Sequence, residues 1–297
     1  MTDFNIEEYL NSLPDDVDII DVSNKNLTYL PDLSRFKNLK TLYCFVNKLT
    51  SLPILSNSLI YLDCENNKLT SLPVLPEKLE ELYCGDNKLT SLPFLPESLI
   101  YLYCYYNQLT LLPVLPENLK FLFCDNNRLT VLPVLPENLK ELYCNDNQLT
   151  SLPVLNTELN ELNCDNNKLL LLPVLHENLK ELYCCNNQLT SLPILPQKLK
   201  ILDCDDNNLT SLPSFNENME RINYRYNPIY KIIHNINLNI LNKNIKIWNN
   251  FRHLYYCLKY KKRFLRIMEP IIKKKYHPSY LNDLTEDDNL DEILNKW

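Results

Sequence analysis

The sequence predicts a repeat solenoid, in which stacked turns form a parallel β-sheet on the concave face, extended segments on the convex face and an α-helical element at the C-terminus. Three observations lead to this prediction. A period of 20 residues recurs with little change between Leu39 and Leu199. At the start of each unit, apolar residues alternate with variable ones, as in a short strand with one buried face. Nearly every unit then carries one or two prolines, which exclude a regular helix from the rest of the turn.

The repeat also sets the predicted domain organisation. The unit that begins at Leu79 reads LEELYCGDNKLTSLPFLPES, and eleven units can be aligned with it. The first, from Val17, is longer at 22 residues, and the last, from Met219, is degenerate. Atypical outer units are expected where a stack is capped against water. We therefore expect an N-terminal cap segment (residues 1–16), the solenoid (residues 17–232) and a basic helical tail with an acidic end (residues 233–297).

Each position of the unit has a predicted role. With Leu79 as position 1, positions 1, 4 and 6 are apolar and should be buried together with the leucines at positions 11, 14 and 17. Positions 3, 5 and 7 vary and should face the concave side. Prolines at position 15 and usually at position 18 predict an extended or polyproline-like return segment. Because a single unit cannot bury its own apolar face, the turns must stack.

Asparagine occupies position 9 in ten successive units, from Asn47 to Asn227. A buried amide needs hydrogen-bond partners, and backbone groups of its own and the neighbouring turn can supply them. We predict a structural asparagine ladder rather than a binding site.

Cysteines form a second ladder, at position 6. Its nine members are Cys44, Cys64, Cys84, Cys104, Cys124, Cys144, Cys164, Cys184 and Cys204. Parallel side chains give an awkward disulfide torsion, and a zinc site needs converging ligands. We predict small buried hydrophobic side chains instead. Cys185, at position 7, should lie on the concave face as a partly exposed thiol, and its sequence neighbours include no base that would activate it.

Composition and motifs argue against catalysis. The chain has one glycine, Gly85, against 19 prolines, which excludes glycine-rich phosphate loops. Its four histidines fall in no catalytic or metal-binding motif, so we expect a protein without catalytic, cofactor or metal sites. The N-terminus lacks the apolar core of a signal peptide, and no apolar run is long enough to span a membrane. An odd number of cysteines, mostly at one spacing, favours a reducing compartment.

The pattern LxxLxCxxNxLTxLPxLPxx resembles the leucine-rich repeat, in the short LPX variety familiar from secreted effectors of enteric bacteria. The resemblance covers residues 17 to about 232. It implies a right-handed arc or superhelix with the sheet on the concave side. Such effectors often carry a large ubiquitin-ligase domain after the repeats, and the roughly 65 residues that follow here are too few for one. A substrate-recruiting role in a ubiquitin-ligase complex remains an alternative by analogy alone.

The variable positions predict a binding surface for a protein or peptide on the concave face. Its centre is aromatic and its C-terminal half is acidic, which favours a basic partner and argues against nucleic acid on this face. The candidate residues are Tyr61, Tyr83, Tyr101, Tyr103, Tyr105, Phe121, Phe123, Tyr143, Glu161, Glu181, Tyr183 and Asp203. Alternatively, the stacked aromatic side chains only stabilise neighbouring strands.

The tail differs in charge from the repeats. Residues 1–227 hold 17 basic and 30 acidic side chains, a net charge of −13, whereas residues 228–282 hold 12 basic and one acidic, a net charge of +11. Apolar residues recur at helical spacing between Ile245 and Tyr276, with a kink expected at Pro270. Two hypotheses remain open: a helical cap on the solenoid, or a basic element that contacts nucleic acid, a membrane surface or an acidic partner.

The segment FRHLYYCLKYKKRFLRIMEPIIKKKYHPSYL resembles a tail found on many proteins of giant DNA viruses of the mimivirus group. The resemblance covers about 30 residues, and the KYHPSYL end carries most of it. It implies a viral protein made in the host cytoplasm and says nothing about a biochemical activity.

Overall fold

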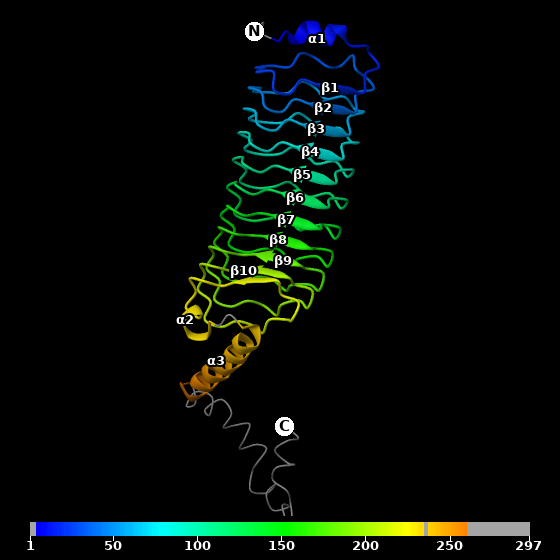
Figure 1. Cartoon of the computed structure of the whole chain (residues 1–297). Coiled ribbons are helices and arrows are strands. Elements are labelled where there is room, and N and C mark those ends of the chain that lie inside the picture. The colour runs from blue at the N-terminus through cyan, green and yellow to red at the C-terminus, as the bar shows by residue number, and fades with distance from the viewer. Residues whose placement is uncertain (1–3, 235–236, 260–297) are drawn as a thin grey trace, which may run out of the picture. The chain divides into compact units, whose positions relative to one another are not determined.

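A computed structural model describes residues 4–234 and 237–259 of the chain. The chain divides into two units between Ile245 and Lys246. Within the first unit, eleven strands of three residues form one parallel sheet in sequence order, which confirms the predicted solenoid (Figure 1). The strands are β1 (Ile19–Asp21), β2 (Thr41–Tyr43), β3 (Tyr61–Asp63), β4 (Glu81–Tyr83), β5 (Tyr101–Tyr103), β6 (Phe121–Phe123), β7 (Glu141–Tyr143), β8 (Glu161–Asn163), β9 (Glu181–Tyr183), β10 (Ile201–Asp203) and β11 (Arg221–Asn223).

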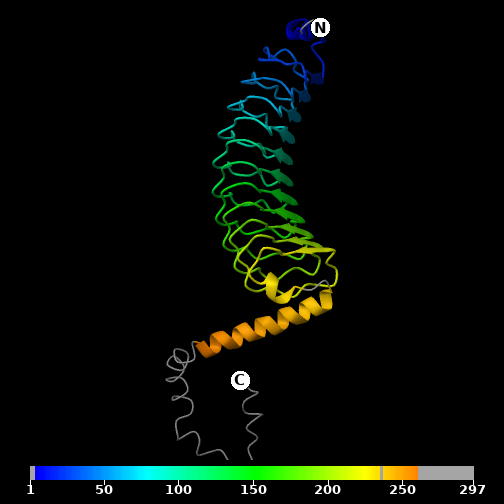
Figure 2. The same cartoon turned by 60° about the vertical axis from the view of Figure 1, so that its left-hand side comes forward.

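Adjacent strands pair with equivalent positions of the unit opposite each other. Leu82 lies opposite Leu62 on one side and Leu102 on the other. The longer first unit keeps this register, with Ile20 opposite Leu42. Each position of the unit therefore forms a row along the stack, named below by its number. Figure 2 shows that the stack of turns curves, with the strands along its inner side.

The core consists of the rows that the sequence predicts. Leu82 and Cys84 have no exposed surface, and the same holds along nearly all of rows 1, 4, 6 and 11. The leucines of rows 14 and 17 are mostly buried and complete the core from the convex side. Because every turn contributes the same side chains, each buried leucine packs against copies of itself above and below.

The convex segments contain neither helix nor strand in any complete turn of the solenoid, as the prolines at positions 15 and 18 require. Left-handed backbone occurs at position 8 of every unit from Val46 to Tyr226, with φ between 47° and 54°. Asparagine or aspartate, which tolerate this conformation, fill most of row 8. The sequence pattern does not predict this turn, because none of these residues is a glycine.

The asparagine ladder joins the turns, as predicted. The side-chain amide of Asn127 donates to the carbonyl oxygens of Cys104 (3.0 Å), Cys124 (3.2 Å) and Asp125 (3.1 Å). Its carbonyl oxygen accepts from the backbone N–H of Leu109 at 2.9 Å. Each asparagine of row 9 thus satisfies backbone groups of two neighbouring turns, which no apolar residue could do.

The N-terminal end of the stack is covered by helix α1 (Ile6–Ser12). The side chain of Asn5 caps this helix by accepting from the N–H groups of Glu7 and Glu8. Ile6 and Leu10 are buried, so the helix contributes to the core of the solenoid. The predicted cap segment therefore contains a helix that is too short to give a periodic signal.

In the part of the chain that the structure describes, two helices follow the last strand: α2 (Tyr230–Ile233) and α3 (Leu238–Lys259). Helix α3 begins seven residues before the helical spacing predicted from Ile245. Leu241 and Ile245 are buried, and the side chain of Asn242 forms two hydrogen bonds of 2.9 Å with the backbone of Phe215. Residues before Lys246 therefore cap the last turn. The rest of the predicted tail helix, with Pro270 and the acidic end, lies outside the described residues, and the proposed boundary at residue 233 stays a prediction.

Candidate protein-binding surface on the concave face

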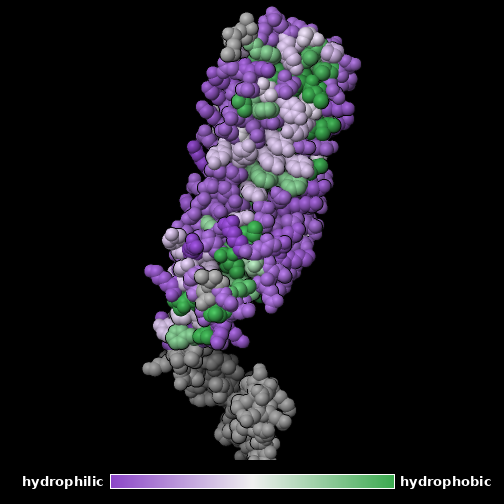
Figure 3. All heavy atoms as spheres, viewed as in Figure 1, coloured by the Kyte–Doolittle hydropathy of each residue, from purple (hydrophilic) through white to green (hydrophobic). Residues whose placement is uncertain are grey.

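Rows 3, 5 and 7 bring all twelve candidate residues to the concave side of the sheet. In β3 to β9, the central residue of each strand is buried and the two outer ones are half-buried. Figure 3 shows a pale band, the colour range of tyrosine and phenylalanine, across the middle turns, with hydrophobic patches nearer both ends of a largely hydrophilic surface. The candidates form one continuous surface from β3 to β10 because the register keeps equivalent positions adjacent.

Four aromatic rings of row 5 form a continuous stack, named here the ring stack. Its members are Tyr83, Tyr103, Phe123 and Tyr143. Successive ring centroids are 4.4–4.6 Å apart, with planes inclined by no more than 22°. Tyr101 and Phe121 of row 3 stack beside it at 4.6 Å. The rings cover one another's faces, so a partner would meet ring edges and tyrosine hydroxyls rather than open π-faces.

The aromatic surface extends toward the N-terminus through Tyr61. Row 5 is interrupted at Asp63, and the ring of Tyr61 from row 3 bridges this gap, at 5.1 Å from Tyr43 and 5.2 Å from Tyr83. Burial, together with the nearby Asp63 carboxylate, raises the pKa of Tyr61. Because these ring contacts join neighbouring strands, they stabilise the sheet as well as shaping the surface.

The ring of Tyr105, in row 7, lies close against the chain's single glycine, Gly85. A Cβ atom added at Gly85 would lie 2.7 Å from Cζ of Tyr105, so the ring needs the space that glycine leaves. Burial, followed by the charge of Glu65 two turns away, raises the pKa of Tyr105. Gly85 does not have positive φ, and its role is close approach rather than conformational freedom.

Three glutamates stand side by side in row 3: Glu141, Glu161 and Glu181, named here the glutamate ladder. Glu161 accepts from the hydroxyl of Tyr143, and Glu181 accepts from that of Tyr183 at 2.7 Å. Burial, followed by the charges of Glu161 and Glu181, raises the pKa of Glu141. Like charges directly opposite each other destabilise a sheet, at a cost on the order of 1 kcal/mol per neighbouring pair at this spacing.

The C-terminal end of the surface is acidic but partly neutralised. Asp203 is 7% exposed, accepts from the Cys185 thiol at 2.8 Å and pairs with Arg221 at 2.6 Å. Its charge is therefore already matched within the chain. Burial and the hydrogen bond to Asp203 raise the pKa of Cys185, which disfavours a reactive thiolate. Burial raises the pKa of Asp165 to about 6.

The described residues offer no other arrangement with evident chemistry. Within residues 4–234 and 237–259, no group of three or more histidine, cysteine, aspartate or glutamate side chains is arranged to hold a metal ion. The nine cysteines of row 6 are buried as free thiols, and burial raises their pKa. Neither α1 nor the described part of the C-terminal helices qualifies as a membrane span.

A family model described as "Leucine Rich repeats (2 copies)" matches residues 57–97, the turns of β3 and β4. The matched residues supply the leucine, cysteine and asparagine rows whose stacking is described above. The chain has the leucine-rich-repeat fold. No curated protein matches this leucine-rich-repeat chain.

Solved structures agree with this assignment. The leucine-rich-repeat chain is similar to YopM from Yersinia enterocolitica, with 30% identity and a TM-score of 0.60 over 73% of this chain and 57% of that one. It is also similar to YopM from Yersinia pestis, a leucine-rich effector protein, with 36% identity and a TM-score of 0.67 over 71% of this chain and 61% of that one. The chain thus spans roughly three fifths of the length of these two relatives.

Proposed function

We propose that this leucine-rich-repeat protein is a non-catalytic scaffold that binds a basic protein or peptide on its concave face. Leucine-rich-repeat scaffolds generally act by binding other proteins, and the two YopM relatives are consistent with this role. The glutamate ladder is the single observation that carries the proposal. Folding does not require three adjacent carboxylates, which repel one another in the free protein. A cationic partner would remove this repulsion.

The proposed surface offers two kinds of contact, one apolar and one charged. The ring stack provides a rigid platform whose exposed edges exclude water from the centre of an interface. The glutamate ladder lies next to this platform and provides negative charge, with Glu161 and Glu181 oriented by tyrosine hydroxyls. Arginine suits such a site best, because its planar fork pairs with carboxylates and its stem packs on aromatic edges. Asp203 is left out of the proposed contact, since it is buried and paired with Arg221.

A charge-reversal experiment tests the proposal. Tagged full-length protein is expressed in host cells, and its captured partners are quantified by mass spectrometry for wild type and for Glu161→Lys with Glu181→Lys. The matched control, Glu8→Lys with Glu80→Lys, makes the same change of charge at exposed positions away from the concave face. Partners bound through the ladder should be lost only from the first variant. Identical partner sets for all three proteins contradict the proposal.

The aromatic platform needs its own test, because stacked rings also stabilise the sheet. Tyr103→Ala with Phe123→Ala should lower partner recovery while circular dichroism still shows the wild-type fold. Unchanged recovery with a retained fold would leave the ring stack a purely structural feature.

The LPX variety of the repeat, a viral origin and a cytoplasmic site of action are finer parts of the same proposal. They are supported by the repeat pattern and by the likeness of residues 251–281 to giant-virus tails. Proximity labelling in infected cells tests the location and the partner together. Labelling of secreted or lumenal proteins only would contradict a cytoplasmic role.

The basic tail supports a second candidate function, contact with nucleic acid or an acidic partner. Residues 228–282 carry a net charge of +11, and phosphate contacts scale with such charge. A salt titration of DNA and RNA binding by the full chain tests the contact with nucleic acid. Absence of binding at low salt would reject that contact. The ubiquitin-ligase alternative rests on analogy, and failure to co-purify any ligase subunit would remove it.

A further inference from the structure

An exposed row of apolar side chains runs along the convex side of the solenoid, at position 16. Its eight consecutive members, named here the convex ridge, are Ile54, Val74, Phe94, Val114, Val134, Val154, Val174 and Ile194. Their exposed fractions lie between 72% and 91%. The flanking leucines at positions 14 and 17 point into the core instead, so the ridge stands out from the surface.

The fold does not require apolar residues in this row. Position 13, also exposed on the convex side, is serine in most units. At position 16 the residue changes between isoleucine, valine and phenylalanine but stays apolar over eight turns. Side chains this exposed add little to the core, and contiguous apolar patches on a protein surface mark interaction sites. The convex ridge therefore needs a partner to explain it.

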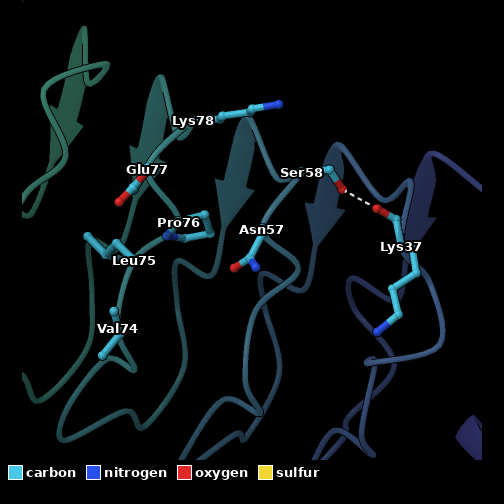
Figure 4. A pocket seen from close by; sticks show the side chains of 8 residues that line it. All are labelled: Lys37, Asn57, Ser58, Val74, Leu75, Pro76, Glu77 and Lys78. Atoms are coloured by element: carbon cyan, nitrogen blue, oxygen red, sulfur yellow. Dashed lines mark hydrogen bonds between the residues drawn. The ribbon is translucent and has the colours of Figure 1, made fainter.

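Negative charge accompanies the convex ridge on one side. Position 19, three residues further along each turn, is glutamate in most units, with Glu77, Glu97, Glu117, Glu137 and Glu177 exposed. Two hollows of about 590 and 600 Å³ border the ridge on this side. The first lies between Val74 and Glu77 of one turn and Asn57 of the turn before, and Lys37 and Lys78 also line it. Ser58 at its edge donates to the carbonyl oxygen of Lys37 at 2.7 Å (Figure 4).

We propose that the convex ridge binds an amphipathic α-helix of a partner protein, with apolar residues facing the ridge and basic residues along the edge beside the row-19 glutamates. Successive ridge residues are separated by one strand spacing, about 4.8 Å at the sheet and wider on the outer side of the curve. The pitch of an α-helix, about 5.4 Å, matches this repeat. Helix side chains can thus enter the notches between ridge residues, as ridges enter grooves between helices.

The shape and charge of the surface set this occupant apart from others. The stack curves with its strands on the inner side (Figure 2), and the exposed ridge lies on the convex segments opposite them, so a second solenoid packed convex against convex would touch few turns. An extended strand repeats its side chains at about 6.7 Å on one face and would drift out of step with the turns. The row-19 carboxylates would repel an anionic lipid surface and would attract the basic edge of a helix.

A fluorescence anisotropy titration tests the proposal with the full-length protein. The probe is a labelled 18-residue peptide with leucine at helical spacing and lysine elsewhere. A second peptide of the same composition alternates leucine and lysine, which favours a strand. The ridge variant is Val134→Ser with Val154→Ser, and the matched control is Leu111→Ser with Val131→Ser, at exposed positions 13 of the same side. All four side chains are more than half exposed, so both variants should melt like wild type.

We expect the helical peptide to bind wild type and the control alike and to bind the ridge variant at least about tenfold more weakly. Equal affinity for the two peptides, or equal binding by the ridge and control variants, overturns the proposal. It is also overturned if Glu161→Lys with Glu181→Lys, rather than the ridge variant, abolishes binding, since the peptide then occupies the concave face. Sedimentation that shows wild-type self-association lost in the ridge variant would instead assign the ridge to a second copy.

Discussion

Single buried side chains decide whether neighbouring turns of the solenoid hold together. Asn127 satisfies three carbonyl oxygens and one N–H from two turns. Asn127→Ala should lower the free energy of unfolding by about 2–4 kcal/mol, because these backbone groups lose their partners in the interior. Urea denaturation measures the change. Asn138→Ala, which removes one exposed hydrogen bond to Glu117, should cost less than about 1 kcal/mol and serves as the control.

The glycine of row 7 gives a second prediction at this scale. Gly85→Ala should destabilise the protein by no more than about 1 kcal/mol, because the new methyl group overlaps only the outer end of the Tyr105 ring, which is half-buried at the surface and can move aside. Tyr105→Ala removes that ring and should make the glycine substitution nearly harmless. A double-mutant cycle in urea measures this coupling. Strictly additive effects would show that the ring of Tyr105 does not need Gly85.

Much of the residue-level detail could be predicted, and the exceptions have physical causes. Rows of buried leucine, cysteine and asparagine follow from the period alone, because the register makes equivalent positions adjacent. The close approach of the Tyr105 ring to Gly85 in row 7 was not predicted, although the single glycine of the chain marks the place. Asp203 was predicted to bind a partner, yet Arg221, 18 residues later, lies on the next strand and pairs with it. The 20-residue period could have placed these two side chains together.

At the scale of elements, the sequence predicted strands better than helices. Alternation and register are local, periodic features that recur in every unit, so eleven strands were expected and found. Helix α1 has seven residues and gives no clear period, although Asn5 before Glu7 and Glu8 is a capping signal. Helix α3 begins at Leu238 rather than Ile245, since contacts with the last turn hold its first residues in place.

Partly buried carboxylates in the strands and in the turns that follow them should make stability depend on pH. Burial raises the pKa of Asp165 from 3.8 to about 6, so the folded protein holds this proton more tightly than the unfolded chain. Stability should therefore fall as the pH rises from about 4 to about 6, and Asp165→Asn should reduce this slope. Burial raises the pKa values of Asp63, Asp125 and Glu141 in the same direction.

Urea denaturation between pH 4 and pH 7 measures this slope. Asp32→Asn is the control. Hydrogen bonds from Ser34 lower the pKa of Asp32, so its protonation changes the stability of the protein at pH values below this window. An unchanged slope in Asp165→Asn, or stability that rises with pH through the window, contradicts the assignment.

At the scale of the whole solenoid, the two faces have different chemistry. The concave face presents ring edges and adjacent carboxylates, and the convex face presents an apolar ridge beside a row of glutamates. The rows are continuous because the turns repeat, so each face offers one long surface rather than a pocket. Because the two proposed binding surfaces lie on different faces, we expect them to bind two partners without overlap.

Photo-crosslinking from the concave face tests the central claim most directly. A benzoylphenylalanine replaces Phe123 in the full-length protein expressed in host cells, and the control protein carries it at Tyr29, an exposed position outside rows 3, 5 and 7. We predict a crosslinked partner from position 123 that is absent from position 29 and is lost when Glu161→Lys and Glu181→Lys are added. No crosslink from position 123, or one that persists after this charge reversal, would contradict binding of a basic partner through the ring stack and the glutamate ladder.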